Sequence, residues 1–292
     1  MKIIGTGLSG LVGSRLVELL SDEFDFDDLS RETHVDITNY PRVTERIATS
    51  PAPWVFHLAA ATDVDGAEKE RSLGEKSQFW VVNVAATENI VNTCRDTGKR
   101  LLYISTDYVF DGTRDFYTEE DMPNPQGWYA ITKYEGEKCV GQLESRALIV
   151  RIANPYWAYP VGKLDFVAKI RERLSQGQGV KAPSDQLFVP TFIDDIAQAI
   201  RVLVKQNAFG IYHVVGGDAL SPYQAAQLIA RTFTLPETLV APTSFAEFFA
   251  GRAPRPFRAV LKHDKIDKLG IKMHDFGEGL TIIKEQLANL TT

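Results

Sequence analysis

The chain has 292 residues, of which 44% are hydrophobic, and a formal net charge of −6. That length allows one large domain or two closely packed ones. The acidic balance argues against a surface for nucleic acid or anionic membranes. No signal peptide precedes the first apolar segment, and no apolar run reaches the roughly 18 residues that cross a bilayer. Since Cys94 and Cys139 lack metal-ligand spacing, we expect a cytoplasmic protein with free thiols.

The N-terminus reads as a strand, a glycine-rich turn and a helix. The apolar residues 2–4 run into GTGLSGLVG (residues 5–13), and a helical apolar pattern follows over 16–20. Glycines permit a tight turn and close approach to a pyrophosphate, whose charge the positive end of the helix attracts. The spacing Gly7-x-x-Gly10-x-x-Gly13 differs from Gly-x-Gly-x-x-Gly, which Gly5, Gly7 and Gly10 satisfy. A plain tight turn is the alternative to the nucleotide-binding interpretation.

Short apolar runs alternate with helical segments along the chain. Strands are expected at 53–59, 100–105, 147–151 and 210–215, and helices include 84–94, which ends at Gly98, and the segment around Tyr129. Because runs that are apolar on both faces belong in a parallel sheet covered by helices, we predict an α/β fold. It would be a Rossmann-type, doubly wound parallel sheet with a smaller C-terminal lobe.

The expected division places the Rossmann domain at residues 1–150, joined by parts of 191–215. Residues 151–292 would form mainly the smaller lobe, since proline becomes frequent there.

Two features carry the chemistry. In LLYISTD (residues 101–107), an apolar strand of the buried type ends in two hydroxyls and a carboxylate. Open α/β sheets bind their ligands at the carboxyl ends of such strands. In GWYAITK (residues 127–133), Tyr129 and Lys133 lie on one helix face, so the ammonium can lower the pKa of the phenol. Thr106 can then hydrogen-bond a substrate oxygen while Tyr129 transfers its proton. The alternative is that the strand-end residues cap a turn and the helix pair is solvated.

The glycine loop, Thr106, Tyr129 and Lys133 together resemble an extended short-chain dehydrogenase/reductase. Within that group the chain is similar to the dTDP-4-dehydrorhamnose reductase family. The matching segments span residues 3 to about 260: DIT (36–38), AAATDVDGAE (59–68), STDYVFDG (105–112), DQLFVPT (185–191) and Arg255-Pro256.

The resemblance implies which residues hold a dinucleotide. The expected cofactor-binding residues are Gly7, Leu8, Ser9, Gly10, Leu11, Ser30, Arg31, Asp36, Ile37, Ala59, Ala60, Ala61, Asn83, Tyr129 and Lys133. Asn83 would contact the cofactor or cap its helix. Counting back from Asp36 puts Ser30 and Arg31 at the turn that discriminates the cofactors, which favours NADPH. A register shift would place Asp27 or Asp28 there and favour NADH.

The implied reaction is NAD(P)H-dependent reduction of the 4-keto group of a nucleoside-diphosphate 6-deoxy sugar, as in dTDP-rhamnose biosynthesis. The cofactor supplies hydride, Tyr129 donates the proton, Thr106 positions the oxygen, and Lys133 holds the nicotinamide ribose and lowers the pKa of Tyr129. The expected substrate contacts are Asp65, Thr106, Asp107, Asn154 and Arg255. We expect no metal site, and read the histidines as packing or surface residues. Tyr103, Tyr108, Phe110, Phe188 and Phe192 are expected in the core. A homodimer is compatible with this interpretation.

The chain also departs from the family. Gly127 and Ala130 stand where members usually carry Asn and Gly, and Asn154 stands where an aromatic residue often lies beside the sugar, a role that Trp157 could take instead. Two other functions stay open. One is an NADP-binding, non-catalytic subunit that resembles the methionine adenosyltransferase beta subunit. The other is a nucleotide-sugar epimerase or dehydratase, although Tyr108 after Asp107 weakens the dehydratase interpretation.

Overall fold

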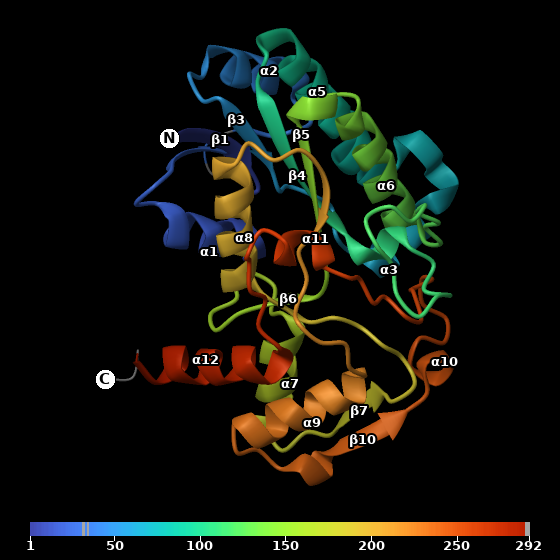
Figure 1. Ribbon diagram of the computed structural model, residues 1–292. Coiled ribbons are helices and arrows are strands. Elements are labelled where there is room, and N and C mark those ends of the chain that lie inside the picture. Colours follow the sequence, from blue (N-terminus) through green and yellow to red (C-terminus); the bar gives the residue numbers. More distant parts are fainter. Residues whose placement is uncertain (31–32, 34, 290–292) are drawn as a thin grey trace.

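A six-stranded, all-parallel sheet forms the centre of the computed structural model, which describes residues 1–30, 33 and 35–289. The strand order is β2-β1-β3-β4-β5-β9 (Figure 1). The strands are β1 (Lys2–Thr6), β2 (Asp25–Leu29), β3 (Trp54–His57), β4 (Arg100–Thr106), β5 (Ala147–Ile152) and β9 (Gly210–His213). Every residue of β3 and β5 is buried, as an apolar run without alternation predicts. The four strands expected from apolar runs are therefore confirmed.

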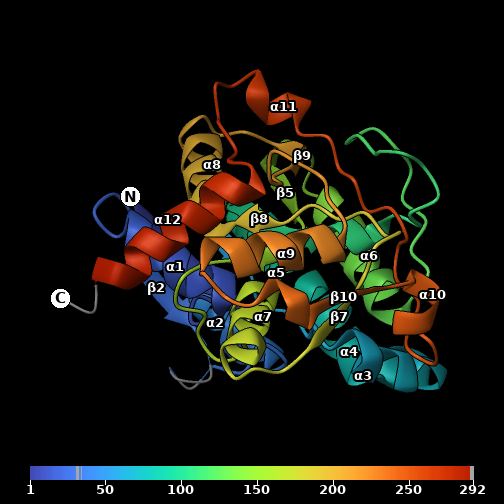
Figure 2. The same cartoon turned by 90° about the horizontal axis from the view of Figure 1, so that it is seen from below.

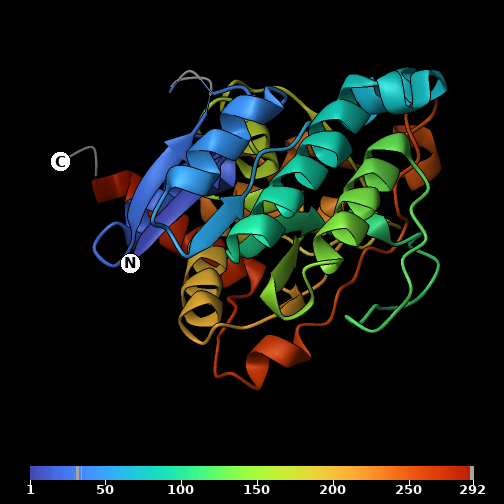
Figure 3. The ribbon, with the colours of Figure 1, turned by 90° about the horizontal axis from the view of Figure 1, so that it is seen from above.

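Helices cover both faces of this sheet, which is the doubly wound arrangement predicted. On one face, α1 (Leu11–Leu20) packs beside α8 (Ile193–Lys205); on the other, α5 (Ala86–Thr97) packs between α2 (Tyr40–Thr49) and α6 (Trp128–Gly141) (Figure 3). Each face has its own apolar core. Leu16 and Ile196 belong to the first core, and Val43, Ile90 and Val140 belong to the second.

The helix before β4 is longer than its pattern indicated. It runs from α4 (Gln78–Trp80) through a π-helical turn at Val81–Ala85 into α5, and ends at Gly98, whose φ is 73°. That left-handed glycine is the predicted stop. Because Asn83 lies inside the π turn, it does not cap a helix, so that alternative is wrong.

Smaller elements fill the rest of the chain. They are α3 (Val64–Lys69), β6 (Pro155–Tyr156), α7 (Phe166–Ser175), β7 (Val180–Pro183), β8 (Thr191–Phe192), α9 (Pro222–Thr232), β10 (Val240–Thr243), α10 (Phe245–Phe248), α11 (Asp264–Asp267) and α12 (Phe276–Asn289). Four 3₁₀ turns lie at Arg71–Lys76, Asp107–Val109, Glu144–Arg146 and Glu237–Leu239. The pair β7 and β10 packs with α7 and α9 into a lobe below the sheet (Figures 1 and 2).

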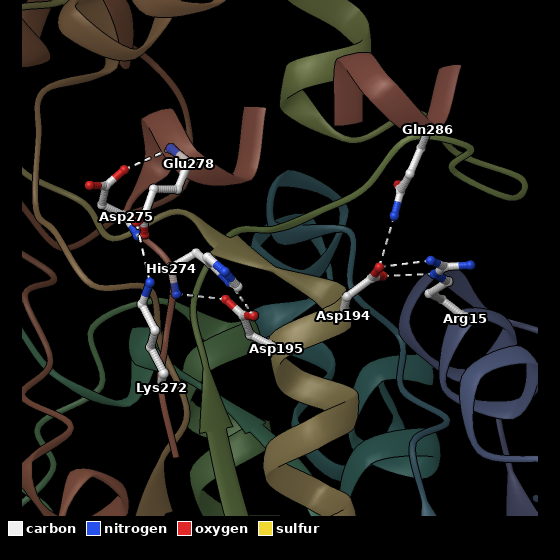
Figure 4. Close-up of polar contacts among 8 residues, drawn as sticks. All are labelled: Arg15, Asp194, Asp195, Lys272, His274, Asp275, Glu278 and Gln286. Carbon is white, nitrogen blue, oxygen red and sulfur yellow. Dashed lines mark hydrogen bonds and ion pairs between the residues drawn. The ribbon is translucent and has the colours of Figure 1, made fainter. Parts of the chain in front are cut away.

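The first turn of α8 joins this lobe to the sheet region. Asp194 accepts two hydrogen bonds from Arg15 of α1, both 2.7 Å, and one from Gln286 of α12 at 3.0 Å (Figure 4). The neighbouring Asp195 accepts from the backbone N–H and the Nδ1 of His274 at 2.9 and 2.7 Å. Two adjacent carboxylates therefore fix α8 against α1 and against the segment that leads into α12.

Among the described residues, no helix is long and apolar enough to cross a membrane. Over residues 1–30, 33 and 35–289, no three His, Cys, Asp or Glu side chains gather in a way that could hold a metal ion. Cys94 and Cys139 are both free thiols.

Candidate functional site

The glycine turn between β1 and α1 leaves no room for side chains. Gly7 has a φ of 71°, and a Cβ there would lie 2.4 Å from the Ala59 backbone nitrogen. A Cβ on Gly13 would lie 2.2 Å from the Gly7 oxygen. Helix α1 begins after Gly10 with no side-chain cap and no acidic residue in its first turn. Its positive end and unpaired N–H groups therefore suit a phosphate group.

A first cavity of about 420 Å³ opens beside this turn. Its lining comes from the glycine loop, from the ends of β2 and β3 and from the helix that begins at Gln78: Gly7, Ser9, Leu29, Ser30, Val35, Asp36, Ile37, Ala59, Ala60, Ala61, Gln78 and Val82. Ser30 lies directly after β2, whereas the carboxylate of Asp27 is bonded to Arg46 at 2.8 Å. Arg31, also predicted here, lies outside the described residues.

Two of the predicted cofactor-binding residues, Leu8 and Asn83, do not line either of the two cavities beside the glycine turn. The Leu8 side chain is buried against Gly5, so only its backbone belongs to the loop surface. Asn83 is buried and holds Ala61 in place: its Oδ1 accepts from the Ala61 N–H at 2.8 Å, and its Nδ2 donates to the Ala61 oxygen at 3.0 Å. Asn83 thus shapes the wall through Ala61.

Thr106, Tyr129 and Lys133 line a second cavity of about 540 Å³. Thr106 ends β4, and Tyr129 and Lys133 lie one turn apart on α6. Gly7, Ser9, Ala59 and Ala60 line both cavities, so the two are continuous. Gly10, Leu11 and Ser105 also face the second cavity. The glycine loop and the three reactive side chains therefore share one groove, at the carboxyl ends of β1, β3 and β4.

The charges in this groove differ from the sequence expectation. Burial raises the pKa of Tyr129, while a hydrogen bond with Thr106 lowers it. Burial also lowers the pKa of Lys133 to about 7. Its ammonium donates to the Ile104 oxygen at 2.8 Å and lies 4.0 Å from the centre of the Tyr103 ring. Lys133 is therefore directed at β4, and the lowering of the Tyr129 pKa by Lys133 stays a prediction.

A third cavity of about 270 Å³ continues toward the lower lobe, and Asn154 lines both it and the second cavity. Its wall is aromatic and basic: Asp107, Tyr108, Asn154, Phe166, Lys169, Ile170, Val180, Lys181, Ala182, Pro183, Gln186, Phe188, Pro222, Phe248, Phe249, Pro256 and Ala259. Tyr108 and Phe188 were expected only as core residues, yet both face this space. Most of these residues could not be predicted, since they come from separate segments that only the fold brings together.

Asp107 lines the third cavity, directly after Thr106 of the second. The side chain is 2% exposed, and its Oδ1 accepts a hydrogen bond from the Thr106 hydroxyl at 3.0 Å. Its Oδ2 has no hydrogen-bond partner among the described residues. Burial raises the pKa of this carboxyl to about 7, against the opposing effect of Thr106. This carboxyl of the third cavity is therefore largely protonated below neutral pH and about half ionised near pH ~7.

Asp65 and Arg255, also predicted to touch substrate, bind each other instead. Their side chains form an ion pair of 2.9 Å, and Asp65 also accepts from the Ala253 N–H at 3.0 Å. Neither residue lines the three cavities. They fasten the segment around 253–255 to α3, so their role in the free chain is to hold that segment over the site.

Trp157 does not take the place of the missing aromatic residue. It is buried, and the Arg15 guanidinium lies 5.1 Å from its ring centre. It lines neither the second nor the third cavity.

Comparison with known proteins identifies the family. The RmlD substrate binding domain model matches residues 1–289. A dTDP-4-dehydrorhamnose reductase of Mycobacterium tuberculosis is 33% identical over 265 residues, which cover 87% of this chain and 81% of that protein. The crystal structure of a dTDP-4-dehydrorhamnose reductase from Bacillus anthracis in complex with NADP has a TM-score of 0.89 and 31% identity, and the match covers 98% of this chain and 99% of that one.

A second kind of relative is also present. The methionine adenosyltransferase 2 subunit beta of Rattus norvegicus is 31% identical over 224 residues, which cover 74% of this chain and 65% of that protein. The similarity therefore includes both reductases and a protein named as a subunit of another enzyme.

Proposed function

Because the chain belongs to the RmlD substrate binding domain family, we propose that it uses NADPH to reduce the 4-keto group of a nucleoside-diphosphate 6-deoxy sugar. The observation that carries this proposal is the shared groove, in which Thr106, Tyr129 and Lys133 line the same cavity as the glycine turn. A protein that only bound the dinucleotide would not need a buried phenol and a buried ammonium beside it.

The residues of the groove fit a dinucleotide. The turn from Gly7 to Leu11 and the start of α1 would hold the pyrophosphate, and Ser30, Asp36 and Ile37 would surround the adenosine. Ala59, Ala60 and Ala61 form the opposite wall, which Asn83 holds in place. NADPH is favoured over NADH, since the B. anthracis relative was solved with NADP and Asp27 is paired with Arg46. Bound NADPH would supply the hydride.

The chain's own residues would then control the oxygen of the ketone. Tyr129 stays protonated at neutral pH, because burial raises its pKa, and it would donate that proton to the emerging alkoxide. Thr106 would orient the oxygen from the end of β4. Lys133 would hold the nicotinamide ribose from the next turn of α6. The nucleoside diphosphate would occupy the third cavity, where Lys169 and Lys181 match its charge and phenylalanines match the base.

Asp107 and Asn154 remain the proposed contacts to the sugar, since both line the third cavity and Asn154 also lines the second. We propose no direct substrate contact for Asp65 and Arg255, because the pair would act by keeping the segment around 253–255 closed over the site.

A non-catalytic subunit is the second candidate, and the similarity to methionine adenosyltransferase 2 subunit beta favours it. One assay separates these functions and the epimerase alternative. Purified protein would be mixed with NADPH and a panel of nucleoside-diphosphate 4-keto-6-deoxy sugars, and the absorbance of the reduced cofactor followed. Stoichiometric oxidation with one sugar supports the reductase. Tight NADPH binding without oxidation supports the subunit, and a changed sugar without net oxidation supports the epimerase.

A further inference from the structure

The Thr106 hydroxyl has one proton, for which Asp107 and Tyr129 both compete with a substrate oxygen. Thr106 Oγ1 donates to Asp107 Oδ1 at 3.0 Å and accepts the Tyr108 N–H at 3.3 Å. A threonine hydroxyl is a single donor, and an ionised carboxylate can only accept. While Asp107 is ionised, the proton of Thr106 is therefore directed at Asp107 and is not available to a substrate oxygen in the second cavity.

The surroundings of Asp107 favour its neutral form. The carboxyl is 2% exposed, and Thr106 is its only side-chain donor among the described residues. Burying a charge is costly, and burial raises the pKa of this carboxyl to about 7 even though Thr106 and the backbone N–H groups of Asp107 and Tyr108 lower it. A protonated carboxyl has one O–H donor and keeps its other oxygen as an acceptor. The separation of 3.0 Å between the two oxygens suits a hydrogen bond in either direction.

We propose that Asp107 is a positioning residue that acts through Thr106: its protonated carboxyl donates to Thr106 Oγ1 and releases the threonine proton for the carbonyl oxygen of the substrate. This inference rests on the proposed function and adds to it. No heavy atom has to move, because only the direction of one hydrogen bond changes. The hydride and the transferred proton still come from the cofactor and Tyr129.

Other charged and titratable groups face the same place. Tyr129 of α6 and the adjacent Tyr108 act electrostatically with Asp107, and the Asp65–Arg255 pair acts on Tyr108. Lys169 of α7 and Lys181 of β7 share the third cavity with Asp107. Lys133 is the strongest competitor, since its own pKa is about 7. A falling rate above neutral pH would therefore not identify Asp107 without a variant.

The test is the single-turnover rate of NADPH oxidation between about pH 5 and about pH 9 in the wild type and in Asp107→Asn. The amide Nδ2 of asparagine can donate to Thr106 at every pH, so the variant is expected to lose one titrating group from its profile. Above pH ~7 the wild-type rate should fall roughly tenfold or more for each pH unit. The fall of the variant's rate over each pH unit should be about tenfold smaller, because one titrating group is missing. Its plateau is expected to be lower, because an amide is a weaker donor than a carboxylic acid. Identical midpoints and slopes would overturn the proposal.

Two further measurements make the result specific. In a Thr106→Val background, Asp107→Asn should leave the pH profile unaltered, because the hydroxyl through which Asp107 acts is gone. The infrared difference spectrum of wild type minus Asp107→Asn should contain a protonated-carboxyl band up to about pH 7, and that band should shift in Thr106→Val. The spectrum requires no turnover, so it tests the hydrogen bond even if no sugar is reduced. A band lost near the ordinary carboxyl pKa of about 4, or one that Thr106→Val does not shift, would refute the inference.

Discussion

Tyr129 is the residue from which the proposed chemistry follows, because its buried phenol keeps a proton at neutral pH. Tyr129→Phe removes that proton and leaves the ring. We expect turnover to fall at least ~100-fold, the scale of general acid catalysis, with little change in NADPH affinity. The matched control is Tyr134→Phe on the same helix, whose hydroxyl contacts Met122 outside the groove. Full activity in Tyr129→Phe would show that another group donates the proton.

Asp107 should lower the stability of the fold at neutral pH. Its folded-state pKa of about 7 exceeds the ordinary aspartate value of 3.8. Between those values the folded chain holds a proton that the unfolded chain releases, so this contribution to stability is complete in acid and is lost as the pH rises through about 7. Asp107→Asn should match the wild type near pH ~4 and gain on the order of a few kcal/mol by pH ~8. Urea denaturation at both pH values checks this, and a variant that is no more stable at the higher pH would contradict it.

At the residue scale, the sequence predicted that Thr106, Tyr129 and Lys133 meet in one cavity, because a strand end and a helix repeat fix where side chains point. Sequence patterns did not predict the properties that depend on how a side chain is buried. The direction of the Lys133 ammonium, the raised pKa of Asp107 and the pairing of Asp65 with Arg255 all depend on neighbours that are distant in the chain.

At the scale of elements, the first turn of α8 is the joint between the sheet and the lower lobe. Asp194→Asn would weaken two charge-assisted hydrogen bonds to Arg15, so we expect the free energy of unfolding to drop by about 1–3 kcal/mol. Glu18→Gln is the control. Glu18 contacts the same guanidinium, but its side chain is 58% exposed. Glu18→Gln should therefore lower the free energy of unfolding by less than about 1 kcal/mol. Equal losses in chemical denaturation would mean that Asp194 is not the joint.

Helices and strands could be predicted from sequence patterns where a whole segment is buried. Apolar runs gave β3, β4, β5 and β9, and Gly98 gave the end of α5. The π turn at Val81–Ala85 was not foreseen, because a single turn with i→i+5 hydrogen bonds is too short to leave a distinct apolar period in the sequence. The short pairs β7–β10 and β6–β8 were also missed, because segments of two to four residues carry little periodicity.

At the scale of the whole molecule, a dinucleotide in the groove should stabilise the fold. At a concentration 100 times its Kd, NADPH would add about 2.7 kcal/mol and raise the Tm by several degrees. Gly7→Ala should abolish this shift, because its Cβ would meet the Ala59 nitrogen. Gly98→Ala is the control. Its φ of 73° gives similar backbone strain, but no atom lies within 4 Å of the added Cβ. Both variants should have a lower Tm, and a shift retained by Gly7→Ala would place the cofactor elsewhere.

The way in which the site is assembled decides which of its residues the sequence could predict. The proposed cofactor groove is built largely from motifs close to single strand ends, so many of its lining residues could be predicted from the sequence. The third cavity gathers Phe166, Gln186, Phe188 and Phe249 from four separate segments, and no local pattern marks them.

Transfer of the cofactor's hydrogen to carbon tests the account most directly. The protein would be incubated with a nucleoside-diphosphate 4-keto-6-deoxy sugar and NADPH that carries deuterium at the transferable position. We predict one deuterium on carbon 4 of the product sugar for each NADP formed. A sugar without deuterium, recovered while the protein holds both ligands, would contradict the proposed reduction.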